Sequence, residues 1–219
     1  MVAEILRRTG DGVPRFFVEF GAADGREAVC VALAGGQGWP GLFMEADAGL
    51  AAGLAATYAD RPDVRTRQAL VTPDTIDALL RDAGVPARIG VLAIDVDGAD
   101  YWIWEAISVT RAAVVVIEYN AHLDPARRLV QPLDAALEPW DATDYFGASL
   151  GALRALGERL GYALVHTDST GSNAFFVRAD LPGTFPAPGA VPIHGPNYLG
   201  AGLRHAPDPL RRPYLDLDA

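Results

Sequence analysis

The stretch Phe16–Ala28, FFVEFGAADGREA, joins an apolar run, a carboxylate and two glycines over a few positions. The apolar run predicts a buried strand that ends near Glu19, and the residues from Arg26 onward have a helical pattern. Between them, Gly21 and Gly25 leave room where a Cβ would collide, so backbone amides and a helix N-terminus can approach a ligand. Such a turn suits a nucleotide-type cofactor, although a tight turn without a ligand would use glycine in the same way.

Apolar runs and helical patterns alternate along most of the remaining chain, which predicts strand–helix–strand units around a parallel sheet. The apolar runs within 88–98 and 112–120 are continuous, as in strands covered on both faces, and belong in the sheet centre. The expected fold is α/β, a Rossmann-like doubly wound, mostly parallel seven-stranded sheet with a C-terminal antiparallel hairpin strand. Strands are expected at 15–20, 41–45, 64–71 (edge-like), 88–98, 112–120, 162–168 and 173–181, and helices at 26–35, 47–59, 72–84, 99–107 and 148–161.

Two segments lack this regularity. Residues 121–145 contain three prolines and scattered aromatics, which is typical of a loop that covers a binding site or is packed by its own aromatic side chains. From Leu181 onward the chain is proline-rich and aperiodic. We therefore expect a domain over residues 1–182 and a C-terminal tail, 183–219, packed on or near it.

Composition narrows the class of protein. The chain has 219 residues, 50% of them hydrophobic, which suits one domain. Its formal net charge of −10, with 18 Lys and Arg, provides no basic surface for nucleic acid. The single cysteine, Cys30, favours a reducing compartment and a buried structural role. Since no signal peptide or membrane span is indicated, we expect a cytoplasmic protein without membrane contact, and a homo-oligomer is compatible with the sequence.

The second expected strand ends at Glu45, where α/β nucleotide folds place an acid that binds ribose hydroxyls. A dinucleotide dehydrogenase would show G-x-G-x-x-G, but Ala22 and Ala23 stand where its second glycine would be. The turn instead resembles the E/D-x-G-x-x-x-G first motif of class I S-adenosylmethionine-dependent methyltransferases. In that resemblance Glu19, Gly21 and Gly25 carry the motif, and Glu45 binds the ribose.

Further segments, VLAIDVDGADYWIWEAI, VVVIEYNA, YFGASLGALRALGERLGYALV and SNAFFVRADL, resemble small bacterial methyltransferases of the FkbM type, over roughly residues 15–182. The resemblance implies an enzyme of glycan or natural-product biosynthesis that uses S-adenosyl-L-methionine. It does not identify the acceptor, because such enzymes serve many acceptors on one scaffold. The cofactor site implied by the resemblance comprises Glu19, Gly21, Ala22, Asp24, Gly25, Glu45, Ala46, Leu70 and Asp95.

Oxygen-bearing side chains follow the two central strands. Asp95 and Asp97 end the fourth expected strand, and Glu118 and Asn120 end the fifth. These are ligands that Mg²⁺ accepts, and a metal there would favour the alkoxide of an acceptor hydroxyl. The alternative is that Asp97 caps the next helix and Asp95 bonds to a backbone amide or to the cofactor.

His122, just past the fifth strand, has a side chain suited to a general base for a hydroxyl acceptor, although a solvated loop histidine is the alternative. The predicted catalytic residues are thus Asp95, Asp97 and His122. The sequence hypothesis is O-methylation of a sugar or of a small metabolite hydroxyl, with N- or C-methylation as a second option. The competing class is a protein of the same fold that binds the cofactor as a regulator, or that catalyses another reaction.

Overall fold

The computed structural model describes residues 1–10, 12–198 and 202–219. The chain forms two compact units. The first unit comprises residues 1–96, 106–116 and 181–183, and the second comprises residues 97–105, 117–180 and 184–219.

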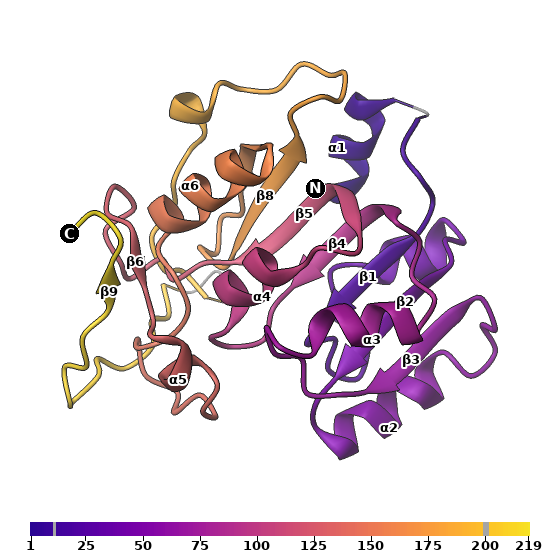
Figure 1. The fold of residues 1–219 in the computed structure, drawn as a ribbon, viewed down its shortest axis with the longest axis horizontal. Helices are drawn as coiled ribbons and strands as arrows, with labels where there is room; N and C mark the ends of the chain where they lie inside the picture. Colours follow the sequence, from indigo (N-terminus) through magenta and orange to yellow (C-terminus); the bar gives the residue numbers. More distant parts are fainter. Residues whose placement is uncertain (11, 199–201) are drawn as a thin grey trace. The chain divides into compact units, whose positions relative to one another are not determined.

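Seven strands form one sheet in the order β3-β2-β1-β4-β5-β8-β7. Figure 1 shows the strands β3, β2, β1 and β4 of the first unit side by side in this order. Neighbours among the first four strands of this order are parallel, whereas β7 and β8 are antiparallel. This topology confirms the predicted Rossmann-like sheet and its C-terminal hairpin. The strands are β1 Phe17–Phe20, β2 Gly41–Glu45, β3 Val64–Gln68, β4 Arg88–Ile94, β5 Arg111–Glu118, β7 Tyr162–Thr167 and β8 Asn173–Arg178.

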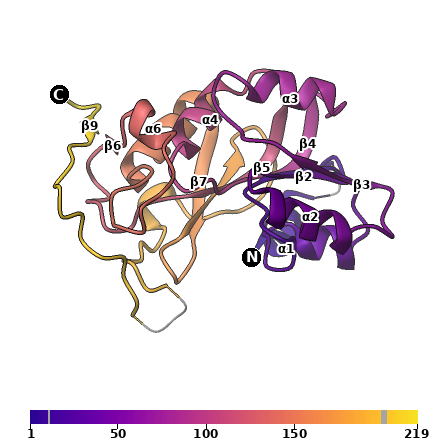
Figure 2. The same cartoon turned by 90° about the horizontal axis from the view of Figure 1, so that it is seen from below.

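Burial along the strands follows their apolar runs. All residues of β1 and β2 are buried, as are those of β4 after Arg88, whereas β3 at the sheet edge is largely accessible to solvent. The first unit also contains α1 Val2–Thr9, α2 Ala48–Thr57 and α3 Ile76–Asp82. Figure 2 shows α3 over one face of the β1–β4 sheet and α2 over the other. The carboxyl ends of these strands are thereby left to the connecting loops.

Two predicted helix starts have different outcomes. The helix predicted from residue 47 begins there, with Asp47 as its N-cap, because Asp47 Oδ1 accepts a hydrogen bond of 2.8 Å from the Leu50 N–H. The helix predicted from Thr72 begins as a regular α-helix only at Ile76. The Thr75 hydroxyl accepts the Thr72 N–H at 3.0 Å, which holds the preceding residues in a turn.

The helix predicted over residues 26–35 is wrong. Only a short π-helical segment, η1 Ala32–Gly36, follows the glycine turn. The carboxylate of Glu19 accepts the backbone N–H groups of Val29 and Cys30, at 2.7 and 2.8 Å, so the chain becomes helical only after these residues. The long helix N-terminus expected to face a ligand at this turn is therefore missing from the fold.

The second unit contains α4 Asp100–Ala106, most of which lies in it, and α6 Leu150–Leu160. Ser149 caps α6 by accepting the Ala152 N–H at 3.2 Å, and Gly161 ends the helix in the left-handed conformation, so the helix lies within the predicted range 148–161. Within the irregular segments lie β6 Leu129–Val130, α5 Leu133–Ala136, η2 Pro188–Ala190 and β9 Leu215–Asp216.

The tail is tied to the middle loop inside the second unit. Strand β9 pairs antiparallel with β6, through Leu215 with Val130 and Asp216 with Leu129. The predicted boundary at residue 182 stays a prediction. Over the described ranges of the chain, no helix has the length and apolar character needed to cross a bilayer.

Candidate functional site

Gly21 turns the chain directly after β1. Its φ is +70°, and a Cβ built on it would lie 1.6 Å from the backbone oxygen of Asp95. Its N–H donates to the Met44 carbonyl at 3.0 Å. The close approach of chain segments at the ends of β1, β2 and β4 therefore requires glycine before any ligand is considered.

Gly25, the second glycine of the motif, has a φ of +77°. A Cβ here would lie 2.6 Å from Leu54 Cδ1 and 2.7 Å from Tyr58 Cε2, both on or next to α2. The Tyr58 hydroxyl also donates to the Gly25 carbonyl at 3.0 Å. This glycine lets α2 pack against the turn.

Glu19 is buried, and both of its carboxylate oxygens accept the backbone hydrogen bonds that end the turn. Burial raises the pKa of Glu19, and the hydrogen bonds from Cys30 and Val29 oppose that shift. Glu19 therefore acts on the turn, and its direct contact with a cofactor stays a prediction.

Glu45 ends β2 and is 9% exposed. Its Oε2 accepts the Ala23 N–H and its Oε1 accepts the Asp47 N–H, both at 2.9 Å. The carboxylate is therefore fixed between the glycine turn and the start of α2. Each oxygen retains a second lone pair, which suits a carboxylate that binds neighbouring ribose hydroxyls.

The other predicted cofactor residues lie in varied surroundings. Ala22 is 1% exposed, and its N–H bonds to Met44 O at 3.2 Å. Asp24 forms a 3.2 Å ion pair with Arg26. Ala46 and Leu70 are exposed, Leu70 to 66%, which leaves their surfaces open to a ligand. Their predicted roles are untested.

Two predicted metal ligands approach each other within the second unit. One carboxylate oxygen of Asp97 lies within 4.8 Å of one carboxylate oxygen of Glu118. Asp97 has a φ of +59°, a conformation that is uncommon outside glycine and often marks functional positions. The pair matches the oxygen donors that Mg²⁺ prefers. Asp95 precedes Asp97 by two positions at the end of the first unit, so the four-residue metal site stays a prediction.

Asn120, the fourth predicted ligand, is fully buried and bonded to the chain itself. Its amide nitrogen donates to the carbonyls of Asp144 and Phe146 at 2.8 and 2.9 Å. Its Oδ1 accepts the His122 N–H at 3.0 Å. Asn120 thus fixes the middle loop and the backbone of His122, a role that spacing alone could not reveal.

His122 is partly buried, and its Nε2 is buried without a hydrogen-bond partner among the described residues. Burial lowers the pKa of its imidazole, although the charge of Asp144 acts in the opposite direction. A lowered pKa keeps the ring neutral near pH 7, and a neutral ring has the acceptor nitrogen that a general base needs.

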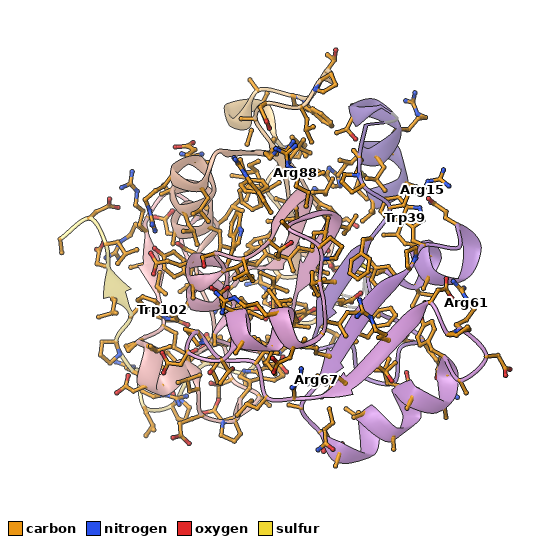
Figure 3. The ribbon with its side chains drawn as sticks, turned by 45° about the vertical axis from the view of Figure 1, so that its right-hand side comes forward. Arg15, Trp39, Arg61, Arg67, Arg88 and Trp102 are labelled. Atoms are coloured by element: carbon orange, nitrogen blue, oxygen red, sulfur yellow. The ribbon has the colours of Figure 1, made fainter. Side chains whose placement is uncertain are left out.

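Aromatic side chains of α4 pack against neighbouring elements of the second unit. Trp104 lies 5.0 Å from Phe176 and 5.7 Å from Tyr162, measured between ring centroids. Trp102, labelled in Figure 3, donates its indole N–H to the Gln131 carbonyl at 2.9 Å. These residues support the second unit's core.

Sequence reasoning gave no role to Tyr198 or His205 of the tail. The structure places both beside His122, with ring centroids 6.0 and 5.7 Å from it. No periodic pattern surrounds them, so the sequence contains no signal that would pair the tail with residue 122.

No protein-family model and no curated protein matches this sequence, but solved structures do. The selenomethionine-substituted CurJ carbon methyltransferase matches with a TM-score of 0.50 and 8% identity, over 82% of this chain and 52% of that one. The N-terminal domain of EvdMO1 with S-adenosylhomocysteine bound has a TM-score of 0.49 and 15% identity, over 84% and 79%. For the mitomycin 7-O-methyltransferase MmcR the values are 0.44 and 18%, over 76% and 49%.

The chain spans about half the length of the first structures it matches, covering 47%, 52% and 55% of them. At such low identities the likeness concerns the fold alone. Together with the strand order, it shows that the chain has the fold of class I S-adenosylmethionine-dependent methyltransferases. The FkbM-type subgroup stays a prediction from the sequence.

Proposed function

We propose that the chain is an S-adenosylmethionine-dependent methyltransferase that methylates a hydroxyl of a sugar or of another small metabolite. The fold supports the class of protein. The observation that carries the proposal is the Glu45 carboxylate, held at the end of β2 by the N–H groups of Ala23 and Asp47. A carboxylate fixed at this strand end is suited to two ribose hydroxyls.

Bound S-adenosylmethionine would supply a sulfonium methyl group to the acceptor oxygen, giving S-adenosylhomocysteine, and the hydroxyl proton would have to pass to a base. The chain's own contribution is to hold the two reactants in line and to activate the acceptor. His122 supplies a neutral imidazole for that proton. Asp97 and Glu118 supply oxygen ligands if a divalent cation is used instead.

The cofactor assignment is tested on Glu45. Glu45→Ala should weaken S-adenosylhomocysteine binding by about 1.5–3 kcal/mol, or about 10- to 150-fold, because ribose hydroxyls lose a charge-assisted partner. Glu45→Gln retains one acceptor oxygen and should lose less. Glu27→Ala is the matched control, since Glu27 is exposed on the same turn. Unchanged affinity in calorimetry, with the variant folded, would count against the site.

Acceptor activation is tested separately, by turnover of labelled cofactor with a panel of acceptors. If a hard cation takes part, chelation should suppress transfer, Mg²⁺ should restore it, and Asp97→Asn should reduce turnover far more than cofactor affinity. If His122 is the base, chelator should have no effect and His122→Ala should cost about 10²–10⁴-fold in rate. Cofactor binding without turnover of any acceptor would favour the regulatory alternative.

A further inference from the structure

A cluster of aromatic rings in the second unit joins the tail to the middle loop. The ring of His205 lies 4.3 Å from Tyr198, 4.6 Å from Trp140 and 5.5 Å from Phe146, between centroids. His122 completes the cluster, 5.7 Å from His205 and 6.0 Å from Tyr198. Aromatic faces gathered in this way are suited to the flat face of a ring-shaped ligand.

Hydrogen bonds hold the tail on both sides of His205. The Tyr198 N–H donates to the Leu203 carbonyl at 3.1 Å, and the Asp144 N–H donates to the Ala206 carbonyl at 2.8 Å. The Asp208 N–H in turn donates to Asp144 Oδ1 at 2.8 Å. The tail next to His205 is therefore held against Asp144 of the loop, whereas Tyr198 is bonded within the tail itself.

Two polar atoms of the cluster are buried without a partner in the described part of the chain: His122 Nε2 and Tyr198 Oη. Other tyrosines of the unit differ, since Tyr119 donates to the His194 carbonyl at 3.0 Å and Tyr145 to the Pro213 carbonyl at 3.1 Å. Buried polar groups are nearly always bonded, and an unbonded one is destabilising. A ligand that carries hydroxyls would supply the missing partners.

The charges near the cluster are mostly negative. Burial lowers the pKa of His205, and Asp97 and Asp144 oppose that shift through their charge. Burial raises the pKa of Tyr198, and Glu118 adds to the rise. A cation, Arg204, acts on His122. Asp168 also raises the pKa of Tyr198, so four carboxylates act against one guanidinium, and a phosphorylated or carboxylated ligand is disfavoured relative to an uncharged one.

We propose that Tyr198 and His205 of the tail, together with His122 and Trp140, bind an uncharged six-membered ring whose hydroxyls bond to Tyr198 Oη and His122 Nε2. The inference rests on the proposed function in one respect, because that function makes the bound ring the methyl acceptor. The ring is an aromatic phenol or a neutral sugar; both present a flat or weakly puckered face and hydroxyls at the rim.

The test uses the full chain and calorimetry with two neutral probes, catechol and methyl β-D-galactopyranoside. Each is paired with an anionic counterpart, 3,4-dihydroxybenzoate and galactose 1-phosphate, and S-adenosylhomocysteine is titrated separately. At least one neutral probe should bind at least tenfold more tightly than its counterpart, and the probe that does so identifies the kind of ring. Absence of binding by both neutral probes, or equal binding of the anions, would overturn the proposal.

Tyr198→Phe, which removes only the unbonded hydroxyl, should weaken the neutral probe at least tenfold, about 1.4 kcal/mol, and leave S-adenosylhomocysteine affinity unchanged. Its melting temperature without ligand should be equal or higher, because no protein hydrogen bond is lost. The matched control Tyr119→Phe should melt lower, since the His194 carbonyl loses its donor, yet bind the probe normally.

Unchanged probe affinity in Tyr198→Phe would refute the site while leaving the proposed function intact. Probe binding that depends on Tyr198 in a protein that does not bind S-adenosylhomocysteine would refute the proposed function and leave the site intact.

Discussion

Substitution of the motif glycines should show whether glycine is required for folding of the chain or for binding of the cofactor. Alanine at Gly21 meets two penalties: a left-handed backbone, with φ of +70°, and a Cβ 1.6 Å from the Asp95 carbonyl oxygen and 2.8 Å from its carbon. The first costs about 1–2 kcal/mol. The second involves backbone, which cannot rotate away, and overpacking of this kind adds typically 1–3 kcal/mol or more.

We therefore expect Gly21→Ala to lower the free energy of unfolding by about 4 kcal/mol, a large part of the usual 5–15 kcal/mol. The chain offers matched controls. Gly38 has a φ of +65° with nothing within 4 Å of its Cβ position, so Gly38→Ala isolates the backbone cost of about 1–2 kcal/mol. Gly36 is open and lacks a positive φ, so Gly36→Ala should be close to neutral. Gly25→Ala should lie between Gly38 and Gly21, because its Cβ meets only side-chain atoms.

Urea denaturation followed by far-UV circular dichroism gives these four free energies, and calorimetry with S-adenosylhomocysteine gives the affinity of each folded variant. A Gly21→Ala variant within 1 kcal/mol of Gly38→Ala would refute the argument from the carbonyl contact. A variant that keeps its stability but loses cofactor affinity would show that the ligand, and not the chain, requires this glycine.

Two further predictions concern the second unit. Asn120→Asp should lower the free energy of unfolding by about 3–5 kcal/mol in urea denaturation, because a buried carboxylate oxygen would replace the amide group that donates to two backbone carbonyls. A change below 1 kcal/mol would contradict the role of the amide. A hydrogen bond from Arg212 lowers the pKa of Asp208 below its ordinary value of 3.8. The ionised Asp208 therefore stabilises the folded state above about pH 3.8, and this stabilisation is lost as the pH falls through the folded-state pKa. The free energy of unfolding should accordingly fall less steeply with decreasing pH in Asp208→Asn than in the wild type. Identical pH dependence below pH 4 would exclude the Asp208–Arg212 ion pair as a cause of acid unfolding.

The sheet was predictable because each central strand has a continuous apolar run of its own in the sequence. The apolar run of β4 is buried from Ile89 to Ile94. The cap residues of α6, Ser149 and Gly161, directly flank the helix in the sequence. These are local features, so a single sequence suffices to locate them. The strand order then follows from the topology of the predicted fold.

The predicted helix after the glycine turn failed for the opposite reason. Its local pattern is helical, but the N–H groups of Val29 and Cys30 bond to Glu19, ten and eleven residues earlier in the chain. The same limit applies to the aromatic cluster, since the contact between His122 and His205 depends on how the tail folds back. Such long-range contacts override local propensity, and an aperiodic tail gives no sign of them.

The candidate site shows why a motif alone does not establish a binding site. Gly21, Gly25 and Glu19 are each accounted for by contacts within the chain: a carbonyl, two side chains and two amides. Glu45 accepts one backbone N–H on each oxygen, as Glu19 does, but Glu45 is 9% exposed and Glu19 only 2%, and Glu19 also bonds to the Cys30 side chain. The glycines and Glu19 are therefore explained by the fold, whereas Glu45, outside the glycine motif, is the more accessible carboxylate and the better candidate for a ligand contact. Its substitution is accordingly the measurement on which the cofactor assignment depends.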